Sequence, residues 1–302
     1  MKIITKIKNI FHSSLDKKVL VLEGGGMRGI FSTGVFQAFT DQKYFPWKLI
    51  IGSSAGALTG AAYAADQIYL ARNAYFTKLL TGDFIKISNI LNNRKNILNL
   101  DWMIDTILKG DEPFDLKKIK KSCPVIITAT NCTDFSSPET VYLNSKKDNI
   151  EIALKATAAI PFLYKGFVKY NNFNLLDGGL LDPIPYKKAL ELGYKEKDIL
   201  VITTRHKGYR KSDESFWIKS LLESYFKKSE YKLLVYTLEN RFKQYNKILD
   251  ELENRYKSID KIYPPVEFKV NRLTKDEKRI LEGFTQGVRA GRYYLKKINQ
   301  SE

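Results

Sequence analysis

A short apolar strand, a glycine-containing turn and a helix follow one another twice within the first third of the chain. The first unit runs from Lys18–Glu23 into the glycine run Gly24–Gly29, and the second runs from Lys48–Ile51 into Gly52–Gly56. Strands that alternate with helices favour a parallel or mixed sheet covered by helices on both faces. We therefore predict an α/β fold.

The remaining elements fit this fold class up to about Thr204, where the composition shifts toward helical patterns. Further strands are predicted at Pro124–Thr130, Glu139–Leu143, Phe173–Leu176 and Asp198–Thr203, and helices at Gly29–Phe39, Ala55–Ala65, Asp101–Leu108, Asn149–Thr157 and Pro185–Leu192. Beyond Thr204 we predict one or two helices over Ser215–Tyr256, a late strand over Pro264–Val270 and a final helix over Asp276–Lys297. The chain thus divides into an α/β unit, 18–205, and a mostly helical C-terminal extension, 206–302, packed on the same domain.

Residues 1–17 predict a short amphipathic helix. Its apolar residues share one face, and its lysines lie largely off that face. We favour packing of this helix on the domain, with a position in a membrane interface as the alternative. The chain has no apolar block of signal-peptide length and no convincing transmembrane segment. We expect a cytoplasmic protein, with peripheral contact at the inner membrane face as a further option.

The net charge of +17 implies a polyanionic partner or a general lysine bias of the proteome. No nucleic-acid-binding motif accompanies the run Lys117–Lys121, which we interpret as a solvated surface, so no nucleic acid is expected as a partner. Cys123 and Cys132 lie nine residues apart. Their spacing predicts neither a disulfide framework nor a zinc site. Calcium-loop and zinc-protease motifs are also missing, so we expect no metal and no cofactor.

The glycine run consists of Gly24, Gly25, Gly26, Met27, Arg28 and Gly29. Successive amide N–H groups at the start of a helix form an anion-binding nest. A dinucleotide fold would also place an acidic residue at the end of the second strand to bind ribose. Here that strand ends in Ile51-Gly52-Ser53-Ser54, so the nucleotide interpretation loses its key residue.

Gly52-Ser53-Ser54-Ala55-Gly56 matches the G-x-S-x-G nucleophile elbow between a strand and a helix. Such a sharp turn presents the central serine, Ser54, at the end of the sheet.

A serine nucleophile needs a base, and the residues alone leave two arrangements open. Asp177-Gly178-Gly179 follows a short strand and offers a carboxylate. The chain has two histidines, His12 in the N-terminal stripe and His206 after a predicted strand. His206 would complete a Ser54–Asp177–His206 triad in the order of the α/β-hydrolases.

Together the three motifs resemble the patatin-like phospholipase family. That family has a glycine-rich oxyanion loop, a G-x-S-x-G serine and a D-G-[GA] aspartate that forms a Ser–Asp dyad without histidine. The resemblance covers about residues 18–205 and includes the segments Ala156–Pro161 and Pro183–Pro185. Asp101-Trp102, Tyr263-Pro264-Pro265 and Gly287–Leu295 are similar to a compact bacterial subgroup. Tyr164-Lys165 departs from the aromatic-Pro-Pro of many members.

The resemblance implies a three-layer fold with a mostly parallel central sheet, helices on both faces and a helical C-terminal extension. It also implies a role for each matching residue: Ser54 as nucleophile, Asp177 as proton acceptor, Gly24, Gly25, Gly26, Met27, Arg28 and Gly29 as oxyanion hole, and Gly52, Gly56, Gly178 and Gly179 as supports of the turns. Arg28 would anchor its loop or contact a substrate phosphate. His206 would then be a strand-end or surface histidine.

The implied function is a serine acyl hydrolase that cleaves acyl esters of phospholipids or related lipids through an acyl-enzyme, without a metal. The basic charge fits a substrate at an anionic membrane surface. The alternatives are a soluble carboxylesterase or thioesterase with the same dyad, and a catalytically idle basic membrane-binding protein. Oligomeric state is left open by the sequence.

Overall fold

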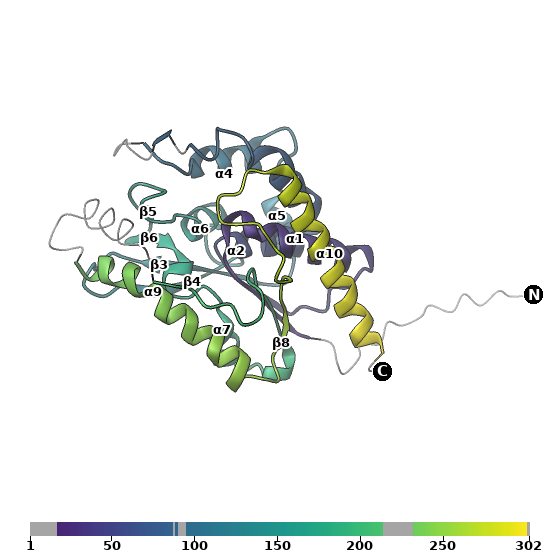
Figure 1. Cartoon of the computed structure of the whole chain (residues 1–302). Coiled ribbons are helices and arrows are strands. Elements are labelled where there is room, and N and C mark those ends of the chain that lie inside the picture. Colours follow the sequence, from purple (N-terminus) through teal and green to yellow (C-terminus); the bar gives the residue numbers. More distant parts are fainter. Residues whose placement is uncertain (1–16, 87, 90–94, 214–231, 301–302) are drawn as a thin grey trace, which may run out of the picture.

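A sheet of eight strands runs through the middle of the part of the chain that the structure describes. The structure is a computed structural model that describes residues 17–86, 88–89, 95–213 and 232–300 (Figure 1). The strands are β1 (Val19–Leu22), β2 (Leu49–Ser53), β3 (Val125–Asn131), β4 (Glu139–Asn144), β5 (Val168–Tyr170), β6 (Phe173–Asp177), β7 (Ile199–Ile202) and β8 (Asp260–Ile262).

Five neighbouring strands of this sheet, in the order β8-β7-β1-β2-β3, pair in parallel. The strands β4 and β6 both pair antiparallel with β3, and β5 pairs antiparallel with β6. The predicted mostly parallel sheet is therefore confirmed, with a smaller antiparallel part at the β3 end.

Helices cover both faces of the sheet, as predicted. Because side chains alternate along a strand, Leu20 and Leu22 of β1 face one helical layer and Val19 and Val21 face the other. The larger layer contains α1 (Gly29–Asp41), α2 (Ala55–Ala64), α3 (Ile68–Asn73), α4 (Leu100–Lys109), α5 (Leu116–Lys121), α6 (Ile150–Thr157) and α10 (Glu277–Asn299). The other layer contains α7 (Tyr186–Glu191), the C-terminal part of α9 (Lys232–Asp250) and the π-turn η7 (Glu251–Arg255).

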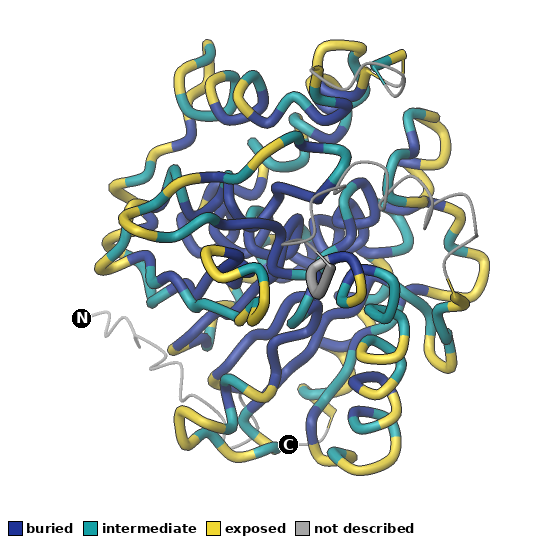
Figure 2. Tube along the Cα trace, turned by 90° about the vertical axis from the view of Figure 1, so that its left-hand side faces the viewer, coloured by how far each residue is buried: buried dark blue, intermediate teal, exposed yellow. Residues whose placement is uncertain are grey.

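Every residue of β1, β2, β3 and β7 is buried, and exposed residues lie at the periphery (Figure 2). The final helix α10 packs directly on α1 through glycines. A Cβ atom on Gly34 would overlap the carbonyl oxygen of Phe284, and one on Gly287 would overlap that of Phe31. The two helices therefore approach backbone to backbone, and this contact joins the C-terminal segment to the α/β unit.

Most predicted elements are confirmed within a few residues, but the late strand over Pro264–Val270 is wrong. The strand in this region is β8, which ends at Ile262 and pairs with β7. Pro264 and Pro265 lack the N–H groups that a sheet ladder needs, so the prolines lie beyond the end of the strand. The predicted helix over residues 1–17 lies almost wholly outside the described residues, as do residues 214–231 of the region Ser215–Tyr256.

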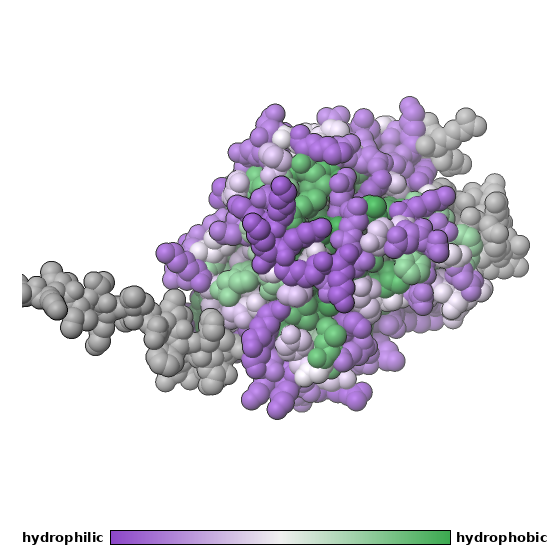
Figure 3. Space-filling model, turned by 180° about the vertical axis from the view of Figure 1, so that it is seen from behind, coloured by the Kyte–Doolittle hydropathy of each residue, from purple (hydrophilic) through white to green (hydrophobic). Residues whose placement is uncertain are grey.

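Among the described residues, no helix combines the length and apolar character that a membrane crossing requires. On the face opposite to that of Figure 1, hydrophilic side chains dominate and hydrophobic ones lie in separate patches between them (Figure 3).

Candidate active site

The carboxyl ends of β2 and β6 meet head-on along one edge of β3. Residues 126–128 of β3 pair with β2 on one side and with β4 on the other, so β6 takes the same side as β2. Ser53, the last residue of β2, pairs with Thr128, and Asp177, the last residue of β6, pairs with the next residue, Ala129. The turn that follows β2, which begins with Ser54, therefore lies next to the end of β6.

Ser54 forms the sharp turn between β2 and α2 that the sequence predicts. Its φ of 52° and ψ of −131° lie outside the regions that side chains favour, as expected of a strained elbow. Gly52 and Gly56 support this turn. A Cβ atom on Gly52 would lie 2.7 Å from the backbone of Ala57, and one on Gly56 would lie 2.7 Å from the carbonyl oxygen of Glu23. The backbone N–H of Ser54 donates to Thr157 Oγ1 at 2.7 Å.

The Ser54 hydroxyl donates a hydrogen bond of 2.7 Å to Asp177 Oδ2. The other carboxylate oxygen of Asp177 accepts from the backbone N–H of Gly179 at 2.6 Å, which fixes the orientation of the side chain. Gly178 lies so close to Thr128 that a Cβ atom would overlap it. The aspartate is buried, and burial raises its pKa. Its hydrogen bond to Ser54 and the nearby charges of Arg272 and Arg241 act in the opposite direction.

The glycine run passes beside the elbow, and a Cβ atom on Gly24 would lie 2.9 Å from Ser54 Cβ. Four of its six backbone N–H groups already donate within the protein. Gly24 donates to Pro183 O, Met27 to Arg272 O, Arg28 to Gly25 O, and Gly29 to the preceding turn. In the described part of the chain the N–H groups of Gly25 and Gly26 have no recorded intramolecular acceptor. Gly26 has a φ of +57°, a conformation that favours glycine.

Arg28 is buried behind this loop. Its Nε donates to Thr204 Oγ1 at 3.2 Å, and the Thr204 hydroxyl in turn donates to Gly24 O at 3.2 Å. Burial, together with the neighbouring positive charge of Arg205, lowers the pKa of Arg28. Of the two roles predicted for Arg28, these contacts favour the anchoring of the loop.

Among the described residues, His206 contacts Lys207 and Tyr209 and makes no hydrogen bond to Ser54 or Asp177. Its Nδ1 lies 2.8 Å from the carbonyl oxygen of Lys207, and its ring meets Tyr209 edge-on at 5.7 Å. It lines neither of the two pockets that contain Ser54.

Two pockets meet at Ser54. The first, here called the cationic pocket, is lined by Glu23, Gly24, Gly25, Gly26, Arg28, Ser54, Ile160, Asp177, Gly179, Leu180, Pro183, Arg205, Tyr209, Lys211, Arg241, Tyr245 and Arg272. The second, here called the apolar pocket, is lined by Gly26, Met27, Ser54, Ala55, Leu58, Tyr75, Leu79, Phe84, Leu98, Leu100, Met103, Ala158, Ile160, Arg272 and Leu273. The apolar pocket shares Leu58, Tyr75, Leu79 and Met103 with a larger cavity, here called the deep cavity, that lies mainly between α2, α3 and α4.

Several residues that bond Ser54 or line the cationic pocket were not among the predicted site residues. Thr157 belongs to the small-residue segment Ala156–Pro161, which could have suggested it. Arg241 and Arg272 belong to no local motif. Sequence reasoning misses them because only the packing of the C-terminal segment brings them to the pocket. Among the described residues, no group of three or more His, Cys, Asp or Glu side chains could hold a metal ion.

A family model described as patatin-like phospholipase matches residues 20–190, which include the glycine run, the elbow and the Asp-Gly-Gly turn. The chain belongs to the patatin-like phospholipase family. A second model, a domain of unknown function (DUF6363), matches residues 231–301.

Curated relatives and a solved structure agree with this membership. The uncharacterized protein YjjU of Escherichia coli K12 is 31% identical over 193 residues, which are 61% of this chain and 51% of that protein. The probable lipid hydrolase 463L of invertebrate iridescent virus 6 is 25% identical over 216 residues, 65% of this chain and 72% of that protein. The chain spans about half the length of the bacterial relatives it matches.

Crystalline VipD from Legionella pneumophila has a similar fold. The TM-score is 0.55 at 15% identity, with 93% of this chain and 67% of that chain covered. This similarity confirms the predicted fold class.

Proposed function

We propose that this protein is a serine acyl hydrolase that cleaves acyl esters of phospholipids or related lipids, with Ser54 as nucleophile and Asp177 as its base. The 2.7 Å hydrogen bond from Ser54 Oγ to Asp177 Oδ2 inside a pocket carries the proposal. A dyad of this kind needs a carboxylate in direct contact with the hydroxyl, because no histidine relays the proton. The probable lipid hydrolase of the iridescent virus supports the class of substrate.

In the first half of the reaction, Ser54 Oγ attacks the acyl carbonyl carbon and its proton passes to Asp177 Oδ2. The raised pKa of the buried carboxyl favours this transfer. The N–H groups of Gly25 and Gly26 are the donors that we assign to the oxyanion, since the other four in the run are already engaged. Such donors are each worth about 3–4 kcal/mol of transition-state stabilisation.

Collapse of the tetrahedral intermediate expels the alcohol part of the lipid, which takes the proton from Asp177. Water then attacks the acyl-enzyme with Asp177 again as base, and the fatty acid leaves. Every group in this scheme belongs to the chain, the lipid or water. We expect Gly52, Gly56, Gly178 and Gly179 to hold the two turns that carry Ser54 and Asp177.

The acyl chain of the substrate would occupy the apolar pocket and continue into the deep cavity. Both are lined mainly by aliphatic and aromatic side chains, and the apolar pocket reaches Ser54 itself. Burial of each methylene group contributes about 0.8 kcal/mol. A long acyl chain therefore fits this route better than a short one does. We also propose that the basic surface favours contact with an anionic membrane that holds the lipid.

Labelling with a fluorophosphonate probe tests the nucleophile. Wild-type protein should be labelled, the Ser54→Ala variant should not, and the Ser53→Ala variant should be labelled like the wild type. Ser53 is a matched control because it is the adjacent buried serine and its hydroxyl makes no hydrogen bond within the part of the chain that the structure describes. Labelling that persists in Ser54→Ala would remove the support for Ser54 as the nucleophile, and a wild-type protein that takes no label would favour the catalytically idle membrane-binding protein.

Product analysis by mass spectrometry tests the substrate. Phospholipid in mixed micelles should release fatty acid with wild-type protein but not with Ser54→Ala. If a short monomeric ester or thioester is cleaved while micellar phospholipid is not, the protein is instead a soluble carboxylesterase or thioesterase.

A further inference from the structure

The segment that matches the domain of unknown function contributes directly to the pocket at Ser54. Arg241 and Tyr245 of α9 and Arg272, which precedes α10, all line the cationic pocket. These residues lie outside the part of the chain that matches the patatin-like model, residues 20–190. The catalytic chemistry proposed above uses none of their side chains.

Arg272 is pressed against the glycine run. Its carbonyl oxygen accepts from the N–H of Met27 at 3.1 Å, and a Cβ atom on Gly26 would lie 2.8 Å from its Cγ. It lines both the cationic pocket and the apolar pocket, so it stands where the two meet at Ser54. The positive charges of Arg272 and Arg241 both lower the pKa of Asp177, so the two guanidinium groups lie within electrostatic range of the proposed base.

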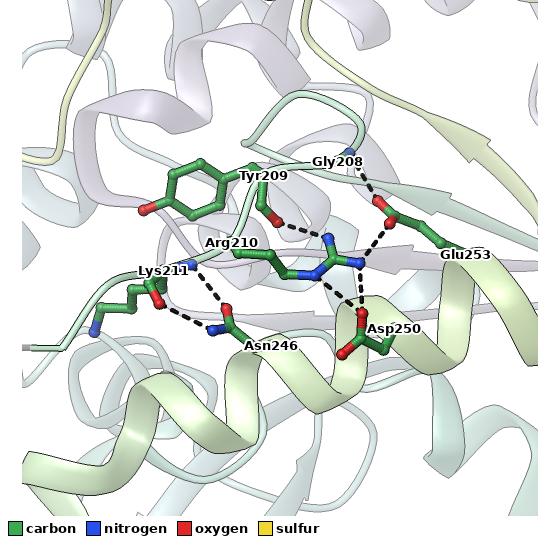
Figure 4. Close-up of polar contacts among 7 residues, drawn as sticks. All are labelled: Gly208, Tyr209, Arg210, Lys211, Asn246, Asp250 and Glu253. Carbon is green, nitrogen blue, oxygen red and sulfur yellow. Dashed lines mark hydrogen bonds and ion pairs between the residues drawn. The ribbon is translucent and has the colours of Figure 1, made fainter.

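Residues 205–211, here called the strap, also contribute to the lining of the cationic pocket. Gly208, Arg210 and Lys211 bind the strap to the C-terminal end of α9 and to η7 (Figure 4). Gly208 N donates to Glu253 Oε1 at 2.9 Å, Arg210 pairs with Asp250 and Glu253 at 2.6 and 2.7 Å, and Lys211 exchanges two hydrogen bonds with Asn246.

One side chain of the strap binds α9 and η7, and three others line the cationic pocket. Figure 4 shows the Arg210 side chain extending toward Asp250 and Glu253 and the Tyr209 ring extending away from them. Tyr209, Lys211 and Arg205 line the cationic pocket. Arg205 lies over the Tyr209 ring at 4.4 Å. The contacts with α9 and η7 thus position Arg205 and Lys211, the two cationic residues of the strap that line the pocket.

Cationic side chains outnumber carboxylates in the lining of this pocket. Its lining includes five cationic side chains, those of Arg28, Arg205, Lys211, Arg241 and Arg272, and two carboxylates, those of Glu23 and Asp177. Glu23 is satisfied by the N–H of Thr204 at 2.5 Å and the hydroxyl of Tyr245 at 2.7 Å. A ligand that binds beside Ser54 on this side therefore meets a field that favours an anion.

We propose that the cationic pocket binds the phosphate group of the lipid whose acyl ester lies on Ser54, and that α9 and the loop ending at Arg272 supply this recognition. The inference rests on the proposed function and deepens it. Guanidinium groups suit phosphate because they donate two hydrogen bonds in one plane to its oxygens. The acyl chain enters the apolar pocket, and the phosphate lies on the opposite side of the serine. A neutral acylglycerol gains only the first of these contacts.

The test compares a phospholipid with a diacylglycerol of the same acyl chains, each in neutral detergent micelles. The readout is the ratio of kcat/KM for the two lipids, because a change in the reactivity of Asp177 affects both lipids alike. We expect wild-type protein to prefer the phospholipid. Arg241→Gln should lower the ratio about 10-fold or more, as expected for the loss of a charge-assisted hydrogen bond. Arg241→Lys should restore part of it.

Arg289→Gln is the matched control, because Arg289 is an exposed arginine of α10 outside the pocket lining. It should leave the ratio as in the wild type. An unchanged ratio in both Arg241→Gln and Arg272→Gln, or a wild-type preference for diacylglycerol, overturns the proposal. Absence of activity on both lipids in the wild type would instead overturn the proposed function.

Binding separates a lipid phosphate from free phosphate. Inorganic phosphate and sn-glycerol 3-phosphate are titrated calorimetrically into Ser54→Ala protein with and without Arg241→Gln. We expect sn-glycerol 3-phosphate to bind, and Arg241→Gln to weaken it by a similar factor to that seen in the kinetics. If only inorganic phosphate binds and the lipid ratio does not change, the pocket serves free phosphate and the lipid proposal is overturned.

Discussion

Ser54 Oγ lies 2.7 Å from Asp177 Oδ2, although the two residues are 123 positions apart in the chain. The contact follows from the sheet, because β2 and β6 end against adjacent residues of β3. A seryl hydroxyl and a buried carboxylate are thus held together by backbone pairing and not by flexible side chains alone. A rigid base of this kind is preorganised for proton transfer.

Substitution of either member of the dyad should abolish hydrolysis. We expect Ser54→Ala and Asp177→Asn each to lower kcat by at least about 10³-fold, because the two residues act as a unit. His206→Ala should stay within about twofold of the wild type, since His206 contacts Lys207 and Tyr209 instead. Steady-state hydrolysis of a phospholipid measures all three. Loss of activity in His206→Ala as well as in Asp177→Asn would instead favour the Ser54–Asp177–His206 triad.

The acid side of the pH–rate profile should report Asp177. The base must be ionised to accept a proton, so kcat/KM should rise with pH as the carboxyl loses its proton. Because burial raises the pKa of Asp177, this rise should lie above the usual range of an aspartate. Arg241→Gln removes a positive charge that lowers this pKa and should move the rise to higher pH. A shift to lower pH would contradict the assignment.

Gly26→Ala should reduce kcat about 10²-fold or more while the protein stays folded. The residue has a φ of +57°, and the added Cβ atom would lie 2.6 Å from Arg272 O, so the loop must move and take its N–H groups with it. Gly193→Ala is the control, because Gly193 has a φ of +86° with no heavy atom within 4 Å of the added Cβ. Equal losses of kcat in the two variants would show that backbone strain alone, and not the oxyanion site, is responsible.

Ala71→Phe should shorten the acyl chains that the enzyme accepts. Ala71 lines the deep cavity but not the apolar pocket at Ser54, so a phenyl ring there blocks only the far end of the route. We expect the kcat/KM for a palmitoyl ester to fall and that for a butanoyl ester to stay the same. Equal falls for both esters would mean that the deep cavity does not hold the chain end.

Asp182 should make stability depend on pH in the weakly acidic range. Burial raises its pKa to about 6, against the opposing effect of a hydrogen bond from the Tyr142 hydroxyl. A carboxyl whose pKa is raised by folding stabilises the folded protein fully at pH values below the pKa that this carboxyl has in the unfolded chain. The stabilisation is lost as the pH rises through the folded-state pKa of about 6. Asp182→Asn cannot ionise, so relative to the wild type it should be more stable at pH 7 than at pH 4.5. Urea unfolding at the two pH values measures this, and a difference of the opposite sign would contradict it.

The sequence alone supports the elements around the site because their signals are local. The glycine run, the elbow at Ser54 and the Asp-Gly-Gly turn each depend on a few neighbouring residues and on the strand before them, and the structure has these strands within two residues of the predicted bounds. The same reasoning fails for Pro264–Val270. Apolar spacing there suggested a strand, but a ladder needs N–H groups and a free neighbouring strand, which spacing does not reveal.

Local pattern therefore determined which residues of the chain carry reactive groups, and tertiary structure decided which of them can act together. The motif does not distinguish its six residues, yet Pro183 and Arg272 accept from two of their N–H groups. Among the described residues the N–H groups of Gly25 and Gly26 have no acceptor, and both residues line the pocket that contains Ser54. Arg241 and Arg272 reach the pocket because α10 packs glycine to backbone on α1 and α9 covers the opposite face of the sheet. Contacts between segments so far apart in the chain depend on how the layers pack, and no short stretch of sequence encodes them.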